Sequence, residues 1–163
     1  MTAPLDLERL LRELSEARVR YVVIGGVAVV AHGSLRTTQD LDLVPDPDAD
    51  NLLRLGNLLA RLDARLTLSP DREFGPRERS ALARGRSLSI ETSLGAVDIV
   101  QRLPGTPSFA ELDASAIEAR PGGVAVRIAS LEHLRAMKRA RSGAQDLADL
   151  AALDALAEQP ADE

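Results

Sequence analysis

The sequence predicts an α/β fold, in which helices pack against a small, mixed and twisted β-sheet. Apolar residues recur at helical spacing between residues 6 and 17, with charged residues between them. Short β-branched stretches such as 21–24 are typical of buried strands. Acidic and apolar residues alternate over 40–43, which places two carboxylates on one face of a further strand.

The other expected elements are marked by turn residues and by capping residues at their ends. Those of the first half are a buried helical turn over 27–32 after Gly25-Gly26, a leucine-rich helix opened by Asp46 as N-cap and Pro47, and a strand over 65–69. Those of the second half are a hairpin of strands 87–92 and 97–101, a helix from Ser108 to about Glu118, a strand over 124–128, a helix that Ser130 caps and that runs through Arg139, and a last helix that Asp146 caps and that runs through Ala157. The tail over 158–163 is expected to fray.

One stretch, 71–86, shows no periodicity and is expected to be a mobile basic loop. It holds five arginines against three acidic residues. Such a charge run is by default a solvated surface, and the alternative is a contact with an RNA acceptor. The residues concerned are Arg72, Arg77, Arg79, Arg84 and Arg86.

Length and composition predict a single domain over 1–163, with a core over about 1–129 and a C-terminal helical part over about 130–157. The chain has 163 residues, 45% of them hydrophobic, which suffices for one core. It has no apolar run of membrane-spanning length, and the N-terminus lacks the pattern of a signal peptide. A cytoplasmic protein without a membrane partner is therefore expected.

Residue counts exclude several kinds of site. The chain has no cysteine and only two histidines, which excludes disulfides, thiolate zinc sites, cysteine nucleophiles and histidine-rich metal sites. Metal chemistry must then use carboxylates, which favour Mg²⁺ or Mn²⁺. A net charge of −5 and 2% aromatic residues argue against non-specific coating of nucleic acid, although they allow a local basic patch.

The strongest chemical pattern is a glycine pair followed by three aspartates. Gly25 and Gly26 stand where a strand passes into a helix, so their N–H groups can approach a phosphate. Asp40 and Asp42 share one strand face and repel each other unless cations lie between them. Asp98, flanked by apolar residues, supplies a third carboxylate. Three such carboxylates can hold two divalent ions about 3.5 to 4 Å apart for an in-line phosphoryl displacement.

This arrangement resembles the polymerase-β nucleotidyltransferase signature: Gly25-Gly26, thirteen intervening residues, then Asp40-Leu41-Asp42-Leu43 and later Asp98. The tail LEHLRAMKRARSGAQDLADL resembles the AbiEii/MenT toxin-type branch of that superfamily. By that resemblance Lys138 holds the phosphates of an NTP and Asp146 completes the site. Many superfamily members have Gly-Ser where this chain has Gly-Gly, which leaves Ser34 or backbone groups to replace the hydroxyl.

The resemblance implies the polymerase-β-like fold and transfer of a nucleotide from an NTP to an acceptor hydroxyl, with Asp98 orienting or deprotonating that hydroxyl. The leading acceptor is the 3′ end of tRNA, with the protein acting as the toxin of a toxin–antitoxin pair and bound by a cognate antitoxin. The alternatives are a small-molecule, aminoglycoside-type transferase, a protein nucleotidyltransferase that acts as an antitoxin, and a non-catalytic NTP-binding module.

Three residues also have purely structural interpretations. Lys138 is expected either on phosphate or as a solvated helix residue, and Asp146 either in catalysis or as a helix cap. Arg36 precedes the carboxylates, where it contacts phosphate or pairs with an acid.

Overall fold

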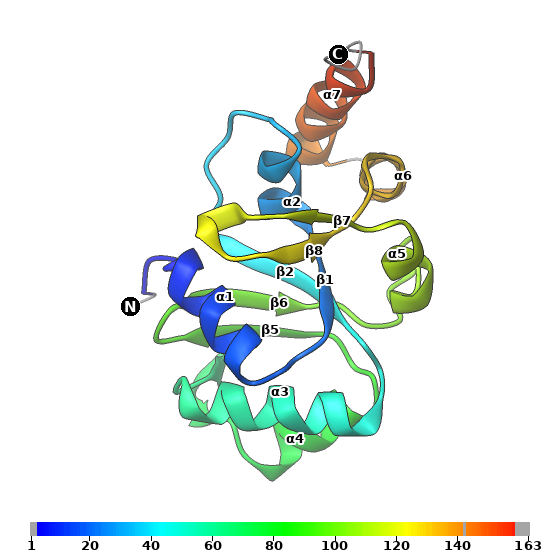
Figure 1. Cartoon of the computed structure of the whole chain (residues 1–163). Coiled ribbons are helices and arrows are strands. Elements are labelled where there is room, and N and C mark those ends of the chain that lie inside the picture. The colour runs from blue at the N-terminus through cyan, green and yellow to red at the C-terminus, as the bar shows by residue number, and fades with distance from the viewer. Residues whose placement is uncertain (1–2, 142, 159–163) are drawn as a thin grey trace.

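The computed structural model describes residues 3–141 and 143–158 as one mixed α/β arrangement (Figure 1). The described strands are β1 (Tyr21–Ile24), β2 (Asp40–Pro45), β3 (Arg65–Leu66), β4 (Ser69–Glu73), β5 (Leu88–Thr92), β6 (Gly95–Ile99), β7 (Ile117–Ala119) and β8 (Val126–Ile128). The described helices are α1 (Leu7–Glu16), α2 (Gly25–Ala31), α3 (Ala49–Arg61), α4 (Pro76–Ala83), α5 (Phe109–Ser115), the 3₁₀ turn η1 (Pro121–Gly123), α6 (Leu131–Arg141) and α7 (Ala144–Glu158). The predicted fold class is confirmed.

All described strands form one sheet in the order β4-β3-β5-β6-β2-β1-β8-β7. The central strand β2 runs antiparallel to β1 and parallel to β6, so the sheet is mixed. Partner residues on paired strands share a face, and the face that carries Leu41 and Leu43 of β2 also carries Val97 and Ile99 of β6. These four side chains are buried, so this face belongs to the hydrophobic core.

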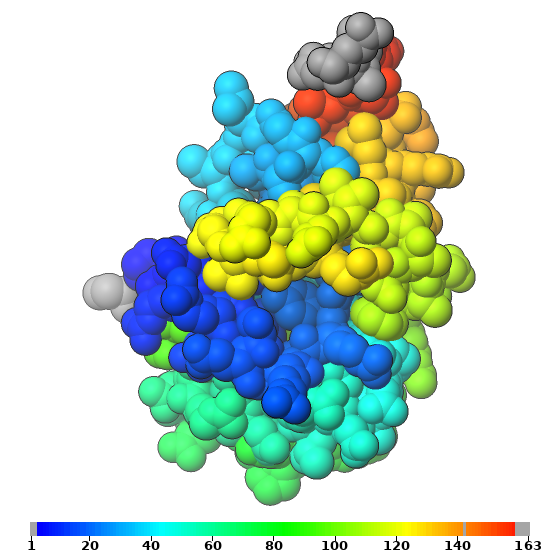
Figure 2. All heavy atoms as spheres, viewed as in Figure 1, coloured from blue at the N-terminus to red at the C-terminus, as the bar shows by residue number. Residues whose placement is uncertain are grey.

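The opposite face of β2 and β6 carries Asp40, Asp42 and Asp98. Most helices gather in two groups at the two ends of the molecule. Figure 1 shows α3 and α4 together at one end of the molecule and α2, α6 and α7 at the other. In Figure 2 the hairpin of β7 and β8 crosses the molecule between α2 and α1. The two C-terminal helices pack on each other, and α6 also contacts α2. Residues of α6 line a cavity together with Gly25 at the start of α2, and Leu156 of α7 lies next to Gly33, beyond the end of α2.

Most expected elements agree with the structure, but α3 begins later than expected. Asp46 is not its N-cap, because its carboxylate accepts from the N–H of Asp48 at 3.0 Å and pairs with Arg20 at 2.6 Å. Asp48 precedes the first helical residue, Ala49. Asp46 therefore links the end of β2 to Arg20, the residue before β1, and does not cap α3.

The expected loop over 71–86 is wrong. Its first residues belong to β4, and Pro76–Ala83 form α4. Proline occupies the first turn of α4, and a side-chain oxygen of Glu78 accepts from the N–H of Gly75 at 3.0 Å. Leu82 is fully buried and anchors α4 next to α3, which carries Gly56 opposite it. One buried leucine is too little apolar periodicity to reveal this helix in the sequence.

The ends of two later helices also differ from expectation. Ser108 does accept from the N–H of Glu111 at 3.2 Å, but α5 ends at Ser115 because Ala116 is extended and β7 follows. The last helix begins at Ala144, so Asp146 lies in its first turn and is not its N-cap. The frayed tail expected at the C-terminus lies, from residue 159 on, outside the described residues. Among the residues that the structure describes, no helix is long and apolar enough to cross a membrane.

Candidate active site

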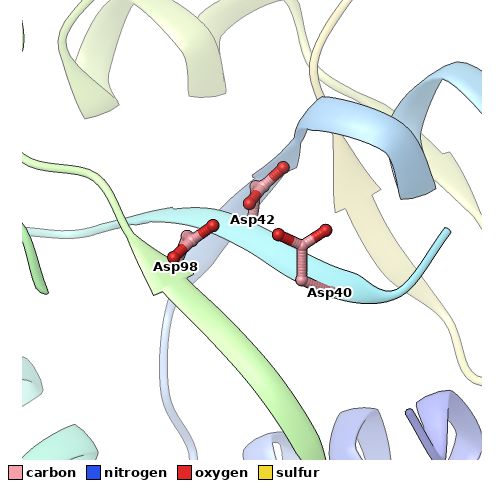
Figure 3. A group of neighbouring side chains, drawn as sticks. All are labelled: Asp40, Asp42 and Asp98. Atoms are coloured by element: carbon pink, nitrogen blue, oxygen red, sulfur yellow. The ribbon is translucent and has the colours of Figure 1, made fainter. Parts of the chain in front are cut away.

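Three aspartates from two neighbouring strands converge on the open face of the sheet. Asp42 of β2 lies in register with Asp98 of β6, and Asp40 lies two residues before Asp42 on the same face. One carboxylate oxygen from each of the three lies within 4.8 Å of those of the others. Figure 3 shows the three side chains pointing toward one another beside the start of α2. The strand alternation seen in the sequence therefore produces one cluster.

The cluster is electrostatically costly without a cation. Burial raises the pKa of Asp42 to about 8, and the charges of Asp40 and Asp98 add to this rise while Lys138 opposes it. Burial and the neighbouring Asp98 likewise raise the pKa of Asp40 to about 6. Three half-buried carboxylates that share a site fit one or two hard divalent cations, because the cations remove the repulsion and carboxylate oxygens are their preferred ligands.

The raised pKa values predict a pH-dependent stability of the metal-free protein. An acid whose pKa is higher in the folded than in the unfolded state binds more protons when folded, so its contribution to stability falls as pH rises between the two values. For Asp42 this window runs from the ordinary aspartate pKa of 3.8 to about 8. We expect Tm, measured by differential scanning calorimetry in EDTA, to fall through this window. Saturating Mn²⁺ should flatten the dependence, and an unchanged slope with Mn²⁺ would contradict ion binding at the cluster.

Gly25 is required for the close approach of α2 to the aspartates. Its φ of +68° is unfavourable for other residues, and a Cβ built on it lies 1.9 Å from Oδ2 of Asp42. Gly26 is also confined, since its Cβ would lie 3.0 Å from the hydroxyl oxygen of Thr38 and 3.3 Å from Cζ of Arg36. The glycine pair thus brings backbone N–H groups to the carboxylate cluster, beside a hydroxyl and a guanidinium.

Lys138 of α6 is a buried cation held by two aspartates of α7. Its side chain is 8% exposed, and its Nζ lies 3.0 Å from Oδ2 of Asp149 and 3.3 Å from Oδ1 of Asp146. Asp149 also accepts from Nη1 of Arg36 at 2.5 Å and from Gln145 at 3.0 Å. The solvated interpretation of Lys138 is therefore wrong, and Arg36 pairs with an acid.

The two remaining expected site residues, Asp146 and Ser34, line neither of the cavities at the aspartate cluster. Asp146 binds Lys138 and accepts from the N–H of Gly143 at 3.2 Å, so it supports the lysine and the start of α7. Ser34 follows the C-terminal end of α2, whereas the glycine pair forms its N-terminal end. The N–H of Ser34 donates to Val29, and its contact with a phosphate stays a prediction.

Two cavities flank the aspartates. The first, of about 300 Å³, lies between the sheet and α6, and it is reached by Gly25, Asp42, Asp98 and Lys138. Its walls are largely apolar: Ile24, Leu88, Ile99, Val100, Leu103, Leu134 and Met137. The second, of about 560 Å³, is polar and lined by Arg36, Thr37, Gln39, Asp40, Glu91, Ala96 and Gln145. The cluster thus stands between an apolar and a polar cavity.

Sequence reasoning assigned no role to Asp149 or Glu91. Asp149 follows Lys138 and Asp146 in the tail that resembles the AbiEii/MenT branch, where only Lys138 and Asp146 were given roles, and it shares the buried side of α7 with Leu153, four residues later. Glu91 shares the aspartate face through the register Asp40–Ala96–Glu91 across β2, β6 and β5. Its Oε2 is buried and has no hydrogen-bond partner among the described residues. That position could not be found without the strand pairing.

No family model matches the sequence, and no curated protein matches it either. Solved structures match in fold. The lincosamide antibiotic adenylyltransferase LnuA, bound to lincomycin, is 15% identical over 96% of this chain and 99% of its own, with a TM-score of 0.63. The antibiotic-resistance factor ANT(2″)-Ia is 17% identical over 91% and 80%, with a TM-score of 0.60. An antigenic nucleotidyltransferase-like protein from Paracoccidioides brasiliensis is 21% identical over 94% and 79%, with a TM-score of 0.56. The chain therefore has a nucleotidyltransferase fold, as the sequence predicts.

Proposed function

We propose that this chain is a metal-dependent nucleotidyltransferase that transfers a nucleotide from an NTP to an acceptor hydroxyl and releases pyrophosphate. The observation that carries the proposal is the convergence of Asp40, Asp42 and Asp98 beside the glycine start of α2. This is the donor set for divalent ions next to backbone groups suited to phosphate. The fold shared with nucleotidyltransferases supports the same reaction.

Mg²⁺ or Mn²⁺ bound to the three aspartates would neutralise charge on the triphosphate and on the attacking oxygen. The chain's own groups account for the remaining steps. The acceptor oxygen attacks the α-phosphorus, the bond from that phosphorus to the pyrophosphate oxygen breaks, and Asp98 orients the hydroxyl and accepts its proton. Lys138 faces the negative charge of the departing pyrophosphate, and the N–H groups of Gly25 and Gly26 bind its oxygens.

The apolar cavity is the better site for the nucleotide. It contains Gly25 and Lys138, which suit phosphates, and it extends into a wall formed by Leu134 and Met137 of α6 and by Leu103. An apolar wall of this kind can hold a base and ribose by burial of their surface. The hydroxyl groups of Ser89 and Thr106, or the backbone beside them, would then discriminate among the bases, whereas the hydroxyl of Ser87 is already bonded to the backbone of Gln101.

The polar cavity is the better site for a small, hydroxyl-bearing acceptor. It meets the cluster at Asp40 and carries Glu91 and two glutamines, which can donate to or accept from hydroxyl groups. Oε2 of Glu91 is buried and has no hydrogen-bond partner among the described residues, so a turn of this side chain toward the cavity would let it accept from a ligand hydroxyl or amine. LnuA, which matches this chain over nearly its full length, is a lincosamide antibiotic adenylyltransferase, which supports a small-molecule acceptor.

A different observation favours the 3′ end of tRNA, the acceptor expected of a toxin. Four arginines surround a cavity of about 320 Å³ beside α4, and Leu88 lines both this cavity and the apolar one at the aspartates. The arginines are Arg72, Arg77, Arg84 and Arg86. An RNA backbone on this patch would lie close to the proposed nucleotide. The AbiEii/MenT branch, the antitoxin partner and protein acceptors stay predictions.

Incubation of the purified protein with each labelled NTP tests the reaction. Transfer to a cellular acceptor fraction is expected with Mg²⁺ or Mn²⁺, and EDTA is expected to stop it without lowering the helical signal in circular dichroism. Transfer that persists after thorough chelation would contradict the mechanism. Metal-dependent NTP binding without transfer to RNA, protein or small-molecule fractions would instead support the non-catalytic alternative.

The salt dependence of the same assay separates the acceptors. Each phosphate of an RNA acceptor that the protein no longer neutralises changes the slope of log K against log salt by about 0.7 to 0.9. We expect a combined change of Arg72, Arg77, Arg84 and Arg86 to Gln to flatten that slope if RNA is the acceptor, while NTP binding stays near normal. A small-molecule acceptor would show little slope in the parent protein as well.

A further inference from the structure

Asp149 is the most enclosed charged residue near the aspartate cluster. It is 2% exposed, although it lies on the last helix, which has few other buried residues. Its Oδ2 contacts both Nη1 of Arg36 at 2.5 Å and Nζ of Lys138 at 3.0 Å, and its Oδ1 accepts from Gln145. One carboxylate oxygen thus joins two cations that come from segments more than a hundred residues apart in the sequence.

The carboxylate of Asp149 is stable in the ionised form despite its burial. Burial alone raises its pKa, but the hydrogen bond and charge of Lys138, the hydrogen bond from Gln145 and the charge of Arg36 outweigh this, and the pKa is lowered. A buried charge of this kind is costly unless it is paired. The pairing therefore fixes the positions of both cations as strongly as it fixes Asp149.

The two cations meet at Oδ2 of Asp149 but line different cavities beside the metal-binding cluster. Lys138 lines the apolar cavity together with Asp42 and Asp98. Arg36 lines the polar cavity together with Asp40, and its Cζ would lie 3.3 Å from a Cβ on Gly26. Neither cation contacts the cluster through a direct ion pair in the described residues. Each is held back by Asp149 at the edge of the space where a triphosphate would bind.

We propose that Asp149 is a positioning residue that fixes Lys138 and Arg36 as a pair of cations for the β- and γ-phosphates of the NTP. This inference rests on the proposed nucleotidyltransferase function and deepens it. One carboxylate on α7 sets the spacing between the two cations, so the last helix takes part in nucleotide binding without touching the nucleotide. Its effect is confined to ligands that carry the two outer phosphates.

The test compares Asp149→Asn with Asp154→Asn on the same helix. Asp154 pairs with Arg135 at 2.7 Å and with Arg139 at 3.8 Å and has a side chain 40% exposed, so its change removes ion pairs between α7 and α6 that do not involve Lys138. Affinity is measured by calorimetry, with Ca²⁺ in place of Mg²⁺, for an NTP and for the nucleoside monophosphate with the same base. Mn²⁺ binding to the cluster and Tm are measured in parallel.

We expect Asp149→Asn to weaken NTP binding by about 10- to 100-fold, the range of one or two charge-assisted contacts. Binding of the monophosphate and of Mn²⁺ should stay within about threefold, since neither involves the outer phosphates. Asp154→Asn should bind all three ligands as the parent does. Equal loss for NTP and monophosphate, or no loss for either, would overturn the positioning role and leave Asp149 as a clamp between helices.

Asp149→Glu keeps the charge and decides the matter if the Asn variant fails to fold. The longer side chain can still pair with both cations, so Tm should recover, but it displaces them by about one methylene and NTP binding should recover only in part. Full recovery of both would overturn the proposal. A parent protein that binds no NTP with any metal would instead overturn the proposed function, so the two failures are distinguishable.

Discussion

Replacement of Asp42 by Asn is expected to reduce metal-dependent nucleotide transfer by at least about a thousandfold, because it removes a ligand from the centre of the metal site. Asp42 is the member of the cluster closest to the glycine start of α2 and has the most strongly raised pKa, about 8. An amide cannot replace the charge that the cations require. Initial rates at saturating NTP, with Mg²⁺ and with Mn²⁺, measure the loss.

The same change is expected to stabilise the metal-free protein. Asn keeps the shape of the side chain, and it removes an acid that must either take up a proton or hold a buried, repelled charge when the chain folds. A gain of about 1 to 2 kcal/mol would raise Tm by about 2 to 8 °C for a domain of this size. Asp50→Asn, on the exposed first turn of α3, is the matched control and should change neither activity nor Tm appreciably. A folded Asp42→Asn protein that transfers nucleotide at the parent rate would exclude the catalytic assignment.

The pair of Asp40 and Asp42 could be predicted from the sequence because its geometry is local. Alternation with a period of two places Asp40 and Asp42 on one face whatever the rest of the fold does. Asp98 required the pairing of β2 with β6, which periodicity does not give and which the resemblance to nucleotidyltransferases supplied. The register of Asp42 with Asp98 across β2 and β6 then completes the cluster.

The features that the sequence did not predict depend on contacts between segments that are far apart in the chain. The pair of Arg36 with Asp149 spans 113 residues, and nothing local to either residue marks it. The starts of two helices were predicted wrongly for a related reason: an aspartate near a helix start has several competing partners. Asp46 binds Arg20, and Asp146 binds Lys138 and the N–H of Gly143, so in both cases tertiary contacts prevail over the simple N-cap.

Gly25→Ala is expected to have the second large effect, through a clash and not through removal of a functional group. The added Cβ would lie 1.9 Å from Oδ2 of Asp42, so the carboxylate must leave its place in the cluster or α2 must move away. Either movement should weaken Mn²⁺ binding by at least about tenfold and transfer by about a hundredfold or more.

The control for Gly25→Ala is Gly123→Ala, because the two glycines share the backbone cost but not the clash. Gly123 also has a positive φ, +82°, yet a Cβ there would meet nothing within 4 Å. Both variants should lose about 1 kcal/mol or somewhat more of folding free energy from the left-handed backbone, visible as a lower Tm. Only Gly25→Ala should also lose Mn²⁺ affinity, measured by electron paramagnetic resonance of free Mn²⁺, and transfer activity. Suppose instead that Tm falls equally in the two variants and that both keep the parent's metal affinity. Asp42 would then hold its ion without the close approach of α2, and the glycine pair would have no part in shaping the metal site.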